Sequence, residues 1–475
     1  MALIPRLKPC LEQIGHMVIS SRMSGHLSGG TQSLSCFARR SRRGDLVFGN
    51  DDQLGIIGLL QEKDTNRKKK GLGTSWPGTR RIDIMLSYGE HSAPHRSPPA
   101  EPVRITAMEG RRALLRFLRL PWRLYADDPA WVPPLILERR QHLSPRNPYF
   151  DHARVRAWIA YRGSKPVGRI TAQIDRLHLQ RYQDATGFFG LLEAEDDPEI
   201  FRALLGAAET WLRGHGMVRI LGPFNLSINQ ECGLLVEGFD TPPMVMMGHS
   251  RPYYAGRIEE QGYEKTKDLI AYRISSMFGL PPAMESLLTR AAKRVQVRTL
   301  RRDRFAEDLR ILQDIFEDAW SNNWGFIPFT AREFDHLGRT LRLLVHNDFV
   351  HIAEVDGEPA AMIVAFPNVN EAIRDLDGRL LPWGWLRLLW RLKVRHPTTA
   401  RVALMGVRKR YQNSRVGAAL ALLVIVSLRE CGVRRGVEEV ELSWILEDNA
   451  GTRSIIESLG GVVYKRYRIY GKGLG

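Results

Sequence analysis

The chain has 475 residues, enough for about three ordinary domains. Its composition, 44% hydrophobic and 9% aromatic, excludes wholesale disorder, a coiled-coil rod and a collagen-like fibre. The net charge of +17 suits nucleic acid, an anionic membrane surface or a phosphorylated cofactor without choosing among them. The four cysteines lie far apart with no metal-ligand spacing, so we expect a reducing compartment, no disulfide framework and no metal.

The first 100 residues differ from the rest. They mix Ser/Gly-rich text, basic clusters and a Pro/Ser tail, with no sustained helical or strand period. The bias toward basic residues up to Arg43 is typical of a targeting presequence, and an arbitrary upstream leader with Met85 as the true start is the alternative. We therefore expect residues 1–100 to be a disordered leader outside the folded part.

Two units of similar organisation follow. The first has a strand over 103–108, a helix over 111–120 ended by Pro121, a hairpin of 157–162 and 166–174, a helix over 198–214 and a strand over 217–221. The second has a strand over 295–300, helices over 305–320 and 330–345, a hairpin of 350–355 and 359–366, and then strand 401–407, helix 416–431, strand 437–446, helix 449–459 and strand 461–470. This order predicts an α/β (α+β) fold with a helix-flanked mixed sheet, used twice.

The apolar run at 416–428 is too short to cross a bilayer, so we expect a buried helix there. It follows a strand and a basic turn, and Gly417 and the alanines after it leave the backbone open. The first amides of such a helix have no intrahelical partner and carry partial positive charge. With Arg408, Lys409, Arg410 and Arg415 nearby, the segment favours an anion such as a diphosphate.

This segment resembles the acyl-CoA pyrophosphate loop of the GNAT (Gcn5-related N-acetyltransferase) superfamily, Q/R-x-x-G-x-G/A. The chain reads Gln412-Asn413-Ser414-Arg415-Val416-Gly417, with Arg415 at the first Gly of the pattern and Ile456 where many members carry a tyrosine general acid. The resemblance implies acyl-CoA, with an acetyl or a long-chain acyl group, as co-substrate. The residues implied to hold it are Val407, Arg408, Gln412, Asn413, Ser414, Arg415, Val416, Gly417, Ala418 and Asn449.

The first unit has no such loop. Before its helix at Pro198 stand the four carboxylates Glu193, Glu195, Asp196 and Asp197, which repel a diphosphate. We therefore expect one acyl-CoA site. The predicted domains are a degenerate GNAT-like domain at 101–277 and a GNAT domain with the acyl-CoA site at 290–475.

Several further phrases resemble a narrower tandem-domain GNAT group, the one that includes bacterial ceramide synthase. They include PWRLYADDPAWVPP at 121–134, GPFN at 222–225, GFDTPP at 238–243 and SWILEDN at 443–449. The resemblance implies an N-acyltransferase that acylates the amino group of a long-chain, sphingoid-like amine. The alternatives are a non-catalytic GNAT-fold acyl-CoA sensor or membrane-bridging protein, and a nucleic-acid binder, which no recognition motif supports.

Acyl transfer to an amine needs a neutral amine, and a carboxylate is the usual base. Glu447 is the first candidate, at the end of the strand beside the pyrophosphate strand, although it could instead cap the next helix, as could Asp448. Glu441 and Ser443 share a face of that strand, with Ser443 as a hydrogen-bond donor. The acceptor-side candidates are Asn323, Trp324 and Glu333, together with Asn225, Asn229 and Glu231, which either reach the site or brace the interface between the domains.

A Trp/Arg stretch at 380–397, LLPWGWLRLLWRLKVRHP, has Trp383, Leu386 and Trp390 at helical spacing beside a second stripe of arginines. A short basic helix with tryptophans on its apolar side suits the headgroup level of a membrane, and packing of the tryptophans into the core is the alternative. The first reading predicts a cytoplasmic protein that is peripheral at the inner membrane face, with CoA phosphates and anionic lipid as the partners of its positive charge.

Overall fold

The computed structural model describes residues 101–475, apart from four side chains within 340–344. These residues belong to one compact unit. The predicted leader lies outside the described residues.

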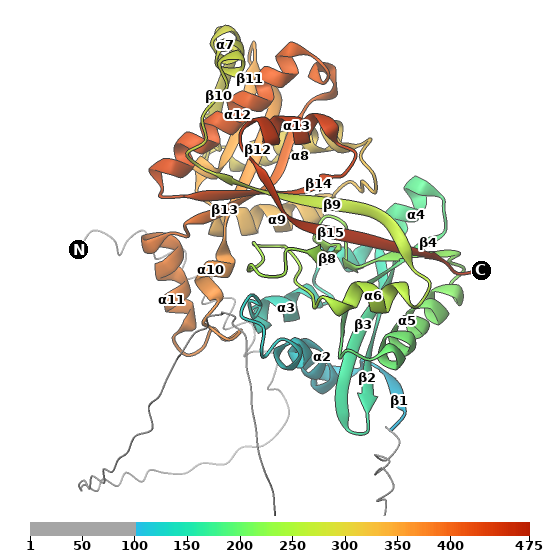
Figure 1. The fold of residues 1–475 in the computed structure, drawn as a ribbon. Helices are drawn as coiled ribbons and strands as arrows, with labels where there is room; N and C mark the ends of the chain where they lie inside the picture. The colour runs from blue at the N-terminus through green and yellow to red at the C-terminus, as the bar shows by residue number, and fades with distance from the viewer. Residues whose placement is uncertain (1–100) are drawn as a thin grey trace, which may run out of the picture. The chain divides into compact units, whose positions relative to one another are not determined.

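The two units predicted from the sequence are two five-stranded runs of one sheet (Figure 1). Within each run the strands are antiparallel except the last two, which are parallel. The first run is β1 (Val103–Ala107), β2 (Ala153–Arg162), β3 (Lys165–Asp175), β4 (Thr186–Ala194) and β5 (Arg219–Gly222); the second is β10 (Val295–Thr299), β11 (Val350–Val355), β12 (Glu358–Pro367), β13 (Thr399–Val407) and β14 (Glu439–Leu446). The predicted mixed α/β fold, used twice, is confirmed.

Two long strands join the runs. β15 (Val462–Gly473) lies antiparallel between β5 and β9 (Glu264–Ser275), and β9 in turn pairs antiparallel with β14. Each run is therefore extended by a strand from the other half of the sequence. A short strand, β8 (Leu234–Glu237), also pairs with β15, and β6 (Phe224–Asn225) and β7 (Glu231–Cys232) form a separate small hairpin. The domain boundaries at 277 and 290 stay a prediction, since the sheet is continuous across them.

Helices cover both faces of the sheet, which is why β12 is buried along almost its whole length. In the first half, α5 (Pro198–Arg213) packs on β1, β2, β3 and β4; in the second, α8 (Phe305–Trp320) packs on β12 and β13, and α12 (Arg415–Arg434) packs on β10, β11, β12 and β13. The remaining helices are α2 (Gly110–Leu124), α3 (Ile136–His142), α4 (Arg176–Tyr182), α6 (Tyr253–Glu259), α7 (Pro282–Ala291), α9 (Ala331–Leu344), α10 (Val369–Ile373), α11 (Gly384–Trp390) and α13 (Ala450–Ser458).

The predicted end of the first helix at Leu120 is wrong, because α2 continues through Pro121. A proline inside a helix leaves the carbonyl four residues earlier without its N–H partner. That carbonyl belongs to Phe117, and the buried Arg169 donates to it from Nη1 at 2.8 Å. A long-range contact therefore replaces the missing helical bond.

Among the described residues, α12 alone is long and apolar enough to meet the criteria for a membrane span, contrary to the expected short run. Half of its most apolar window is buried inside the fold. Leu420, Val424 and Leu428 belong to the core of the second half. Its hydrophobicity therefore reflects its place over the sheet.

A buried charged triad links the two halves. His152 lies directly before β2, and its Nδ1 lies 2.9 Å from the carboxylate of Asp175 at the end of β3. Its Nε2 lies 3.2 Å from Glu333 of α9. Burial alone would lower the pKa of His152, but the bonds to both carboxylates outweigh burial and raise the pKa to about 9. The protonated imidazole therefore stabilises the fold.

The triad predicts a pH-dependent contribution to stability. Since the pKa of His152 is above its ordinary value, its contribution is full below about pH 6.5 and is lost as pH rises through 9. We expect His152→Gln to lower the free energy of unfolding by about 3 kcal/mol at pH 6, with the gap from wild type narrowing above pH 9. Urea unfolding of wild type and variant at pH 6 and above pH 9 measures this difference in the free energy of unfolding. An equal difference at the two pH values would contradict a protonated His152.

Candidate functional site

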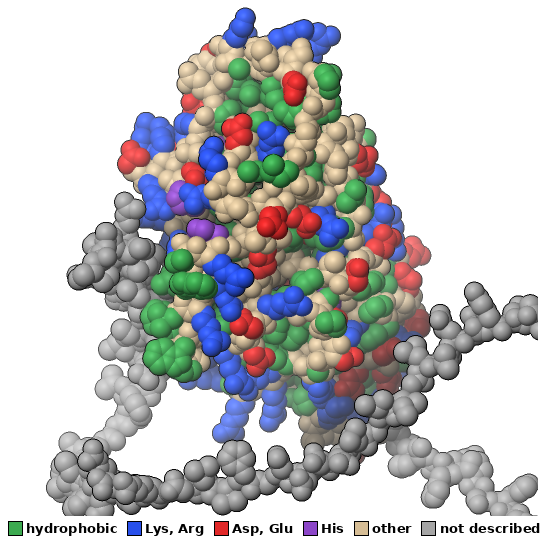
Figure 2. Space-filling view, turned by 60° about the vertical axis from the view of Figure 1, so that its left-hand side comes forward, with side chains coloured by type: hydrophobic (Ala, Val, Ile, Leu, Met, Phe, Trp, Pro, Cys, Tyr) green, Lys and Arg blue, Asp and Glu red, His purple; other side chains and the backbone are tan. Residues whose placement is uncertain are grey.

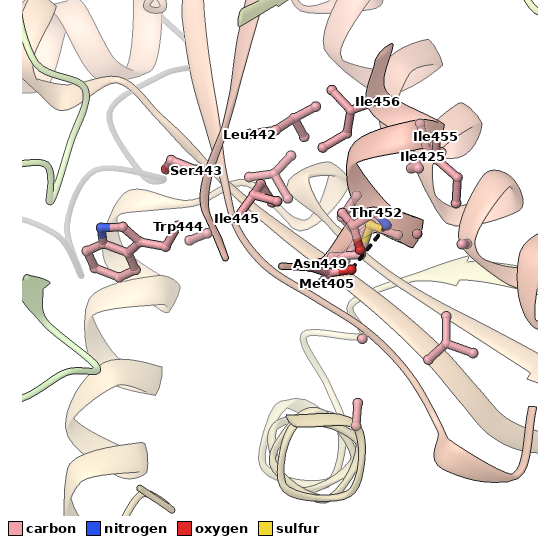
Figure 3. A pocket seen from close by; sticks show the side chains of 18 of the residues that line it. Met405, Ile425, Leu442, Ser443, Trp444, Ile445, Asn449, Thr452, Ile455 and Ile456 are labelled. Atoms are coloured by element: carbon pink, nitrogen blue, oxygen red, sulfur yellow. Dashed lines mark hydrogen bonds between the residues drawn. The ribbon is translucent and has the colours of Figure 1, made fainter. Parts of the chain in front are cut away.

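The site begins where β13 and β14 stop pairing. The parallel ladder joins Thr399–Val402 to Glu439–Leu442, and beyond it the strands diverge. A cavity of about 980 Å³ lies at this split and extends beneath α12 and α13. Figure 3 shows Leu442 and Ile445 of β14 on the side of α13, and Ser443 and Trp444 turned away from it. The cavity therefore has a helix side and an opposite, acceptor side.

The predicted pyrophosphate loop forms one end of the cavity. Ser414 caps α12, since its Oγ accepts from the amide of Gly417 at 3.0 Å. A Cβ at Gly417 would overlap the carbonyl oxygen of Tyr411, so the tight turn requires glycine. The cavity-lining residues from the predicted set are Val407, Gln412, Asn413, Ser414, Arg415, Gly417 and Ala418. The orphan amides of the first helical turn and the Arg415 guanidinium favour an anion here.

Two residues of the predicted set lie elsewhere. Arg408 donates from Nε to the carbonyl of Pro359 at 2.7 Å and forms an ion pair with Asp314. Val416 is 43% exposed and does not line the cavity. Gln412 lines the cavity while its side chain donates to the carbonyl of Val407 at 2.8 Å, which braces the loop.

Asn449 lies at the mouth of the cavity and caps α13. Its Oδ1 accepts from the amide of Thr452 at 3.1 Å (Figure 3). Asp448 also lines the cavity, and Lys267 pairs with its carboxylate at 3.0 Å, which keeps the pKa of Asp448 low. Glu447 and Asp448, the two alternative caps suggested by the sequence, therefore do not cap α13.

The acceptor side takes residues from both halves. Asn323 and Trp324, in the connection between α8 and α9, line the cavity. Asn229, in the connection between β6 and β7, lines it too, and donates from Nδ2 to the carbonyl of Ile327 at 2.9 Å. The first half therefore supplies part of the wall, together with Ile228 and Cys232.

The other three acceptor-side candidates have structural roles outside this cavity. Glu333 caps α9 through Thr330 and pairs with His152. Asn225 donates from Nδ2 to Glu231 at 2.9 Å. Burial would raise the pKa of Glu231, but its ion pair with Arg139 outweighs burial and lowers the pKa to about 2. Their prediction as substrate contacts is not supported by these positions.

The first half has the same split between its parallel strands, but its own chain fills it. The β4–β5 ladder covers only Thr186–Phe188 and Arg219–Leu221. A Cβ at Gly190 would overlap the carbonyl of Phe224, so β6 lies directly against β4. The Asn225 Oδ1 accepts from the amide of Leu191 at 2.8 Å. The cavity beside this split is only about 40 Å³, which supports a single acyl-CoA site.

Glu447, the first candidate for the base, is turned out of the cavity. Lys265 of β9 donates to its Oε2 at 2.6 Å, and the amide of Asp268 donates to its Oε1 at 3.1 Å. Burial would raise its pKa, but these bonds outweigh burial and lower it. The position of Glu447 therefore argues against the predicted catalytic role and indicates a structural one between β9 and β14.

The other two catalytic candidates belong to one buried network. Ser443 lines the cavity, and its Oγ accepts from the Nε of Arg401 at 2.6 Å. Behind it, Glu441 lies 3.4 Å from Arg401, and the hydroxyl of Tyr464 donates to it. Burial raises the pKa of Glu441, which makes this carboxylate a stronger base than an exposed one.

Sequence reasoning missed Arg401 and the bulge at Trp444. Arg401 is fully buried, and its guanidinium lies 4.3 Å from the centre of the Trp444 ring. Trp444 adopts a φ of +56°, and the ladder to β9 shifts register there, between Leu442 and Ile445. Backbone strain of this kind concentrates at functional sites. An arginine between the buried Ala400 and Val402 was the available signal.

The chain is similar to several known proteins. Residues 309–460 match the model of the acetyltransferase (GNAT) family. The chain is 51% identical over 360 residues to Protein YghO of Escherichia coli, covering 76% of this chain and 92% of that protein. It is 47% identical over 365 residues to the bacterial ceramide synthase of Caulobacter vibrioides, covering 76% and 95%. A solved tandem GNAT protein from the clavulanic acid biosynthesis pathway has a TM-score of 0.47 at 12% identity, covering 78% and 99%.

The chain belongs to the GNAT family, and it is an acyltransferase that uses an acyl-CoA and an amine. Within the family it groups with the bacterial ceramide synthase, and the two runs of its sheet make it a tandem member.

The turn at Gly417 predicts a loss of CoA binding on substitution. Gly417→Ala displaces the Tyr411 carbonyl and the helix cap, so we expect CoA to bind at least tenfold more weakly in calorimetry. Gly256→Ala in α6 is the matched control, since a Cβ there meets nothing within 4 Å. Equal CoA affinity for both variants would refute the placement of the diphosphate at this turn.

Proposed function

We propose that this protein transfers a long acyl group from CoA to the amino group of a long-chain, sphingoid-like amine at a membrane surface. The observation that carries the proposal is a large cavity, apolar along most of its lining, that runs from an anion-binding helix terminus to an acceptor wall. Similarity to a bacterial ceramide synthase over 95% of its length supports the substrate class.

The filled split of the first half is a guide to what binds in the open one. β4 carries a bulge past the end of its ladder with β5, and the Leu191 amide there binds a carboxamide oxygen from Asn225. β13 carries a bulge in the same place, where Ala403 has no partner on β12 and lines the cavity. The carbonyl oxygen of a pantetheine amide or of the thioester is the same kind of hydrogen-bond acceptor for the bulge of β13.

The network behind Ser443 supplies a route for the proton. We assign Ser443 to the contact with the acceptor nitrogen and Glu441 to the base. The ammonium proton passes through the Ser443 hydroxyl to Glu441, and the neutral amine then attacks the thioester carbon. As the carbon–sulfur bond breaks, the remaining extra proton on nitrogen goes to the departing sulfur, so the products are the amide and the CoA thiol. Arg401 holds Ser443 and compensates the Glu441 charge.

The exposed face of the Trp/Arg stretch supports membrane contact. Trp383 is 68% exposed and Trp390 is 52% exposed, so these tryptophans do not pack into the core. Leu381, Leu386 and Val394 are also exposed. In Figure 2 hydrophobic side chains gather beside Lys and Arg on the lower left of the molecule. Tryptophan with arginine suits the interface of an anionic bilayer, and at the inner face such a protein is cytoplasmic and peripheral.

The assignment of Glu441 predicts a specific kinetic defect. With palmitoyl-CoA and a sphingoid base, we expect Glu441→Gln to lower kcat by a factor of about 10²–10⁴. Because burial raises the pKa of Glu441, wild-type activity rises with pH through that raised pKa, and the variant loses this limb. The rate of CoA release, followed across pH, measures both kcat and its pH dependence.

Two controls make this prediction decisive. Glu447→Gln, outside the cavity, is expected to keep the wild-type pH profile, and Ser443→Ala is expected to lower kcat with little change in KM for acyl-CoA. A Glu441→Gln enzyme that binds acyl-CoA, melts like wild type and turns over at the wild-type rate would refute the base. Binding without turnover by the wild-type protein would favour the acyl-CoA sensor.

The membrane proposal predicts charge-sensitive vesicle binding. Trp383→Glu with Trp390→Glu is expected to reduce co-sedimentation with vesicles containing phosphatidylglycerol at least tenfold. Val218→Glu with Val433→Glu, two exposed apolar residues elsewhere, is the matched control. Equal sedimentation of the two double variants would exclude this surface as the membrane contact.

A further inference from the structure

The cavity continues past the vertex of the split, on the helix side of the sheet. Within the paired part of β13 and β14, Ala400, Val402, Val440 and Leu442 line it. The alternate residues face the other way, as period two requires. The floor of this extension is therefore wholly apolar.

The roof comes from α12 and α13. The lining residues of α12 recur every three or four positions along one face: Gly417, Ala421, Ile425, Leu428 and Gly432. At 1.5 Å per residue this face spans roughly 22 Å, which is far longer than an acetyl group needs. α13 and its end add Leu459 and the two isoleucines labelled in Figure 3, Ile455 and Ile456.

Polar groups at the far end of the extension are already bonded. Arg429 donates from Nη1 to the carbonyl of Phe278 at 2.8 Å, and its guanidinium lies 5.0 Å from the centre of that ring. The Ser276 hydroxyl donates to the carbonyl of Val437 at 2.6 Å. These bonds tie the Nη1 of Arg429 and the Ser276 hydroxyl to the backbone, and the apolar lining around them, which includes Phe278, Leu428 and Val437, suits a hydrocarbon chain.

We propose that this extension, the tail channel, holds the alkyl tail of the acyl group. The channel starts beside the anion-binding turn at Gly417, so it is continuous with the CoA end of the cavity. On the acceptor side, Trp324 packs in the same apolar cluster as Trp444, which turns away from α13. The wall of Asn229, Asn323 and Trp324 is left for the amine. The inference rests on the proposed use of long acyl groups and names the residues that select chain length.

Binding of CoA thioesters, measured below their micelle concentration and without an amine, tests the channel separately from catalysis. We expect wild-type affinity to rise from acetyl-CoA through octanoyl-CoA to palmitoyl-CoA, by up to about fourfold per buried methylene. Ile425→Trp is expected to remove most of this rise while leaving acetyl-CoA and CoA within about twofold. Val433→Trp, exposed on the same helix, is the matched control and keeps the rise.

A second pair of variants locates the channel by length. Ala421→Phe, near the CoA end, is expected to reject octanoyl-CoA and palmitoyl-CoA alike, and Gly432→Leu, near the far end, only palmitoyl-CoA. Equal wild-type affinity for all three thioesters would overturn the channel. So would an Ile425→Trp enzyme whose selectivity changes for amine chain length instead of acyl length. Failure of sphingoid acylation with a normal thioester series would reject the proposed acceptor and keep the channel.

Discussion

Two parallel strands that pair over four residues and then part are the constraint on which the rest of this structure depends. Beyond Val402 and Leu442, backbone groups that face the split have lost their ladder partners, and buried backbone groups need substitutes. Whatever enters the split must offer hydrogen bonds along one edge and apolar surface around them. An acyl-pantetheine arm has both properties, since its amides and thioester are set in a hydrocarbon chain.

The two halves satisfy this constraint in different ways. In the first half, Asn225 places its own carboxamide against the Leu191 amide, and the close approach of Gly190 to Phe224 leaves no room for a ligand. In the second half, no such segment of residues 101–475 lies in the cavity, and glycine at 417 keeps the turn open for an anion. One fold thus serves as wall and brace in one copy and encloses the cavity of the proposed catalytic site in the other.

Local patterns predicted what depends on local chemistry. Alternation and helical spacing located the five strands of the second run, four of the five strands of the first, and the long helices, but missed β4, β9, the short strands β6, β7 and β8, and several short helices. The small residues at 417 and 418 do line the cavity. Contacts between distant segments were not predictable in this way. Glu447 is held by Lys265 from β9, a strand whose charged start hid its period, and the buried pair of Arg401 and Glu441 is brought together by sheet register.

The exchange of β9 and β15 has a consequence for how the chain comes to its native state. β15, the last strand in the sequence, lies beside β5, which ends about 240 residues earlier. During synthesis the sheet of the first half has an open edge until β15 leaves the ribosome, and such edges invite pairing with other chains. The two halves therefore complete their folding together. The pairing of β15 with β5 closes one of the longest loops in the fold.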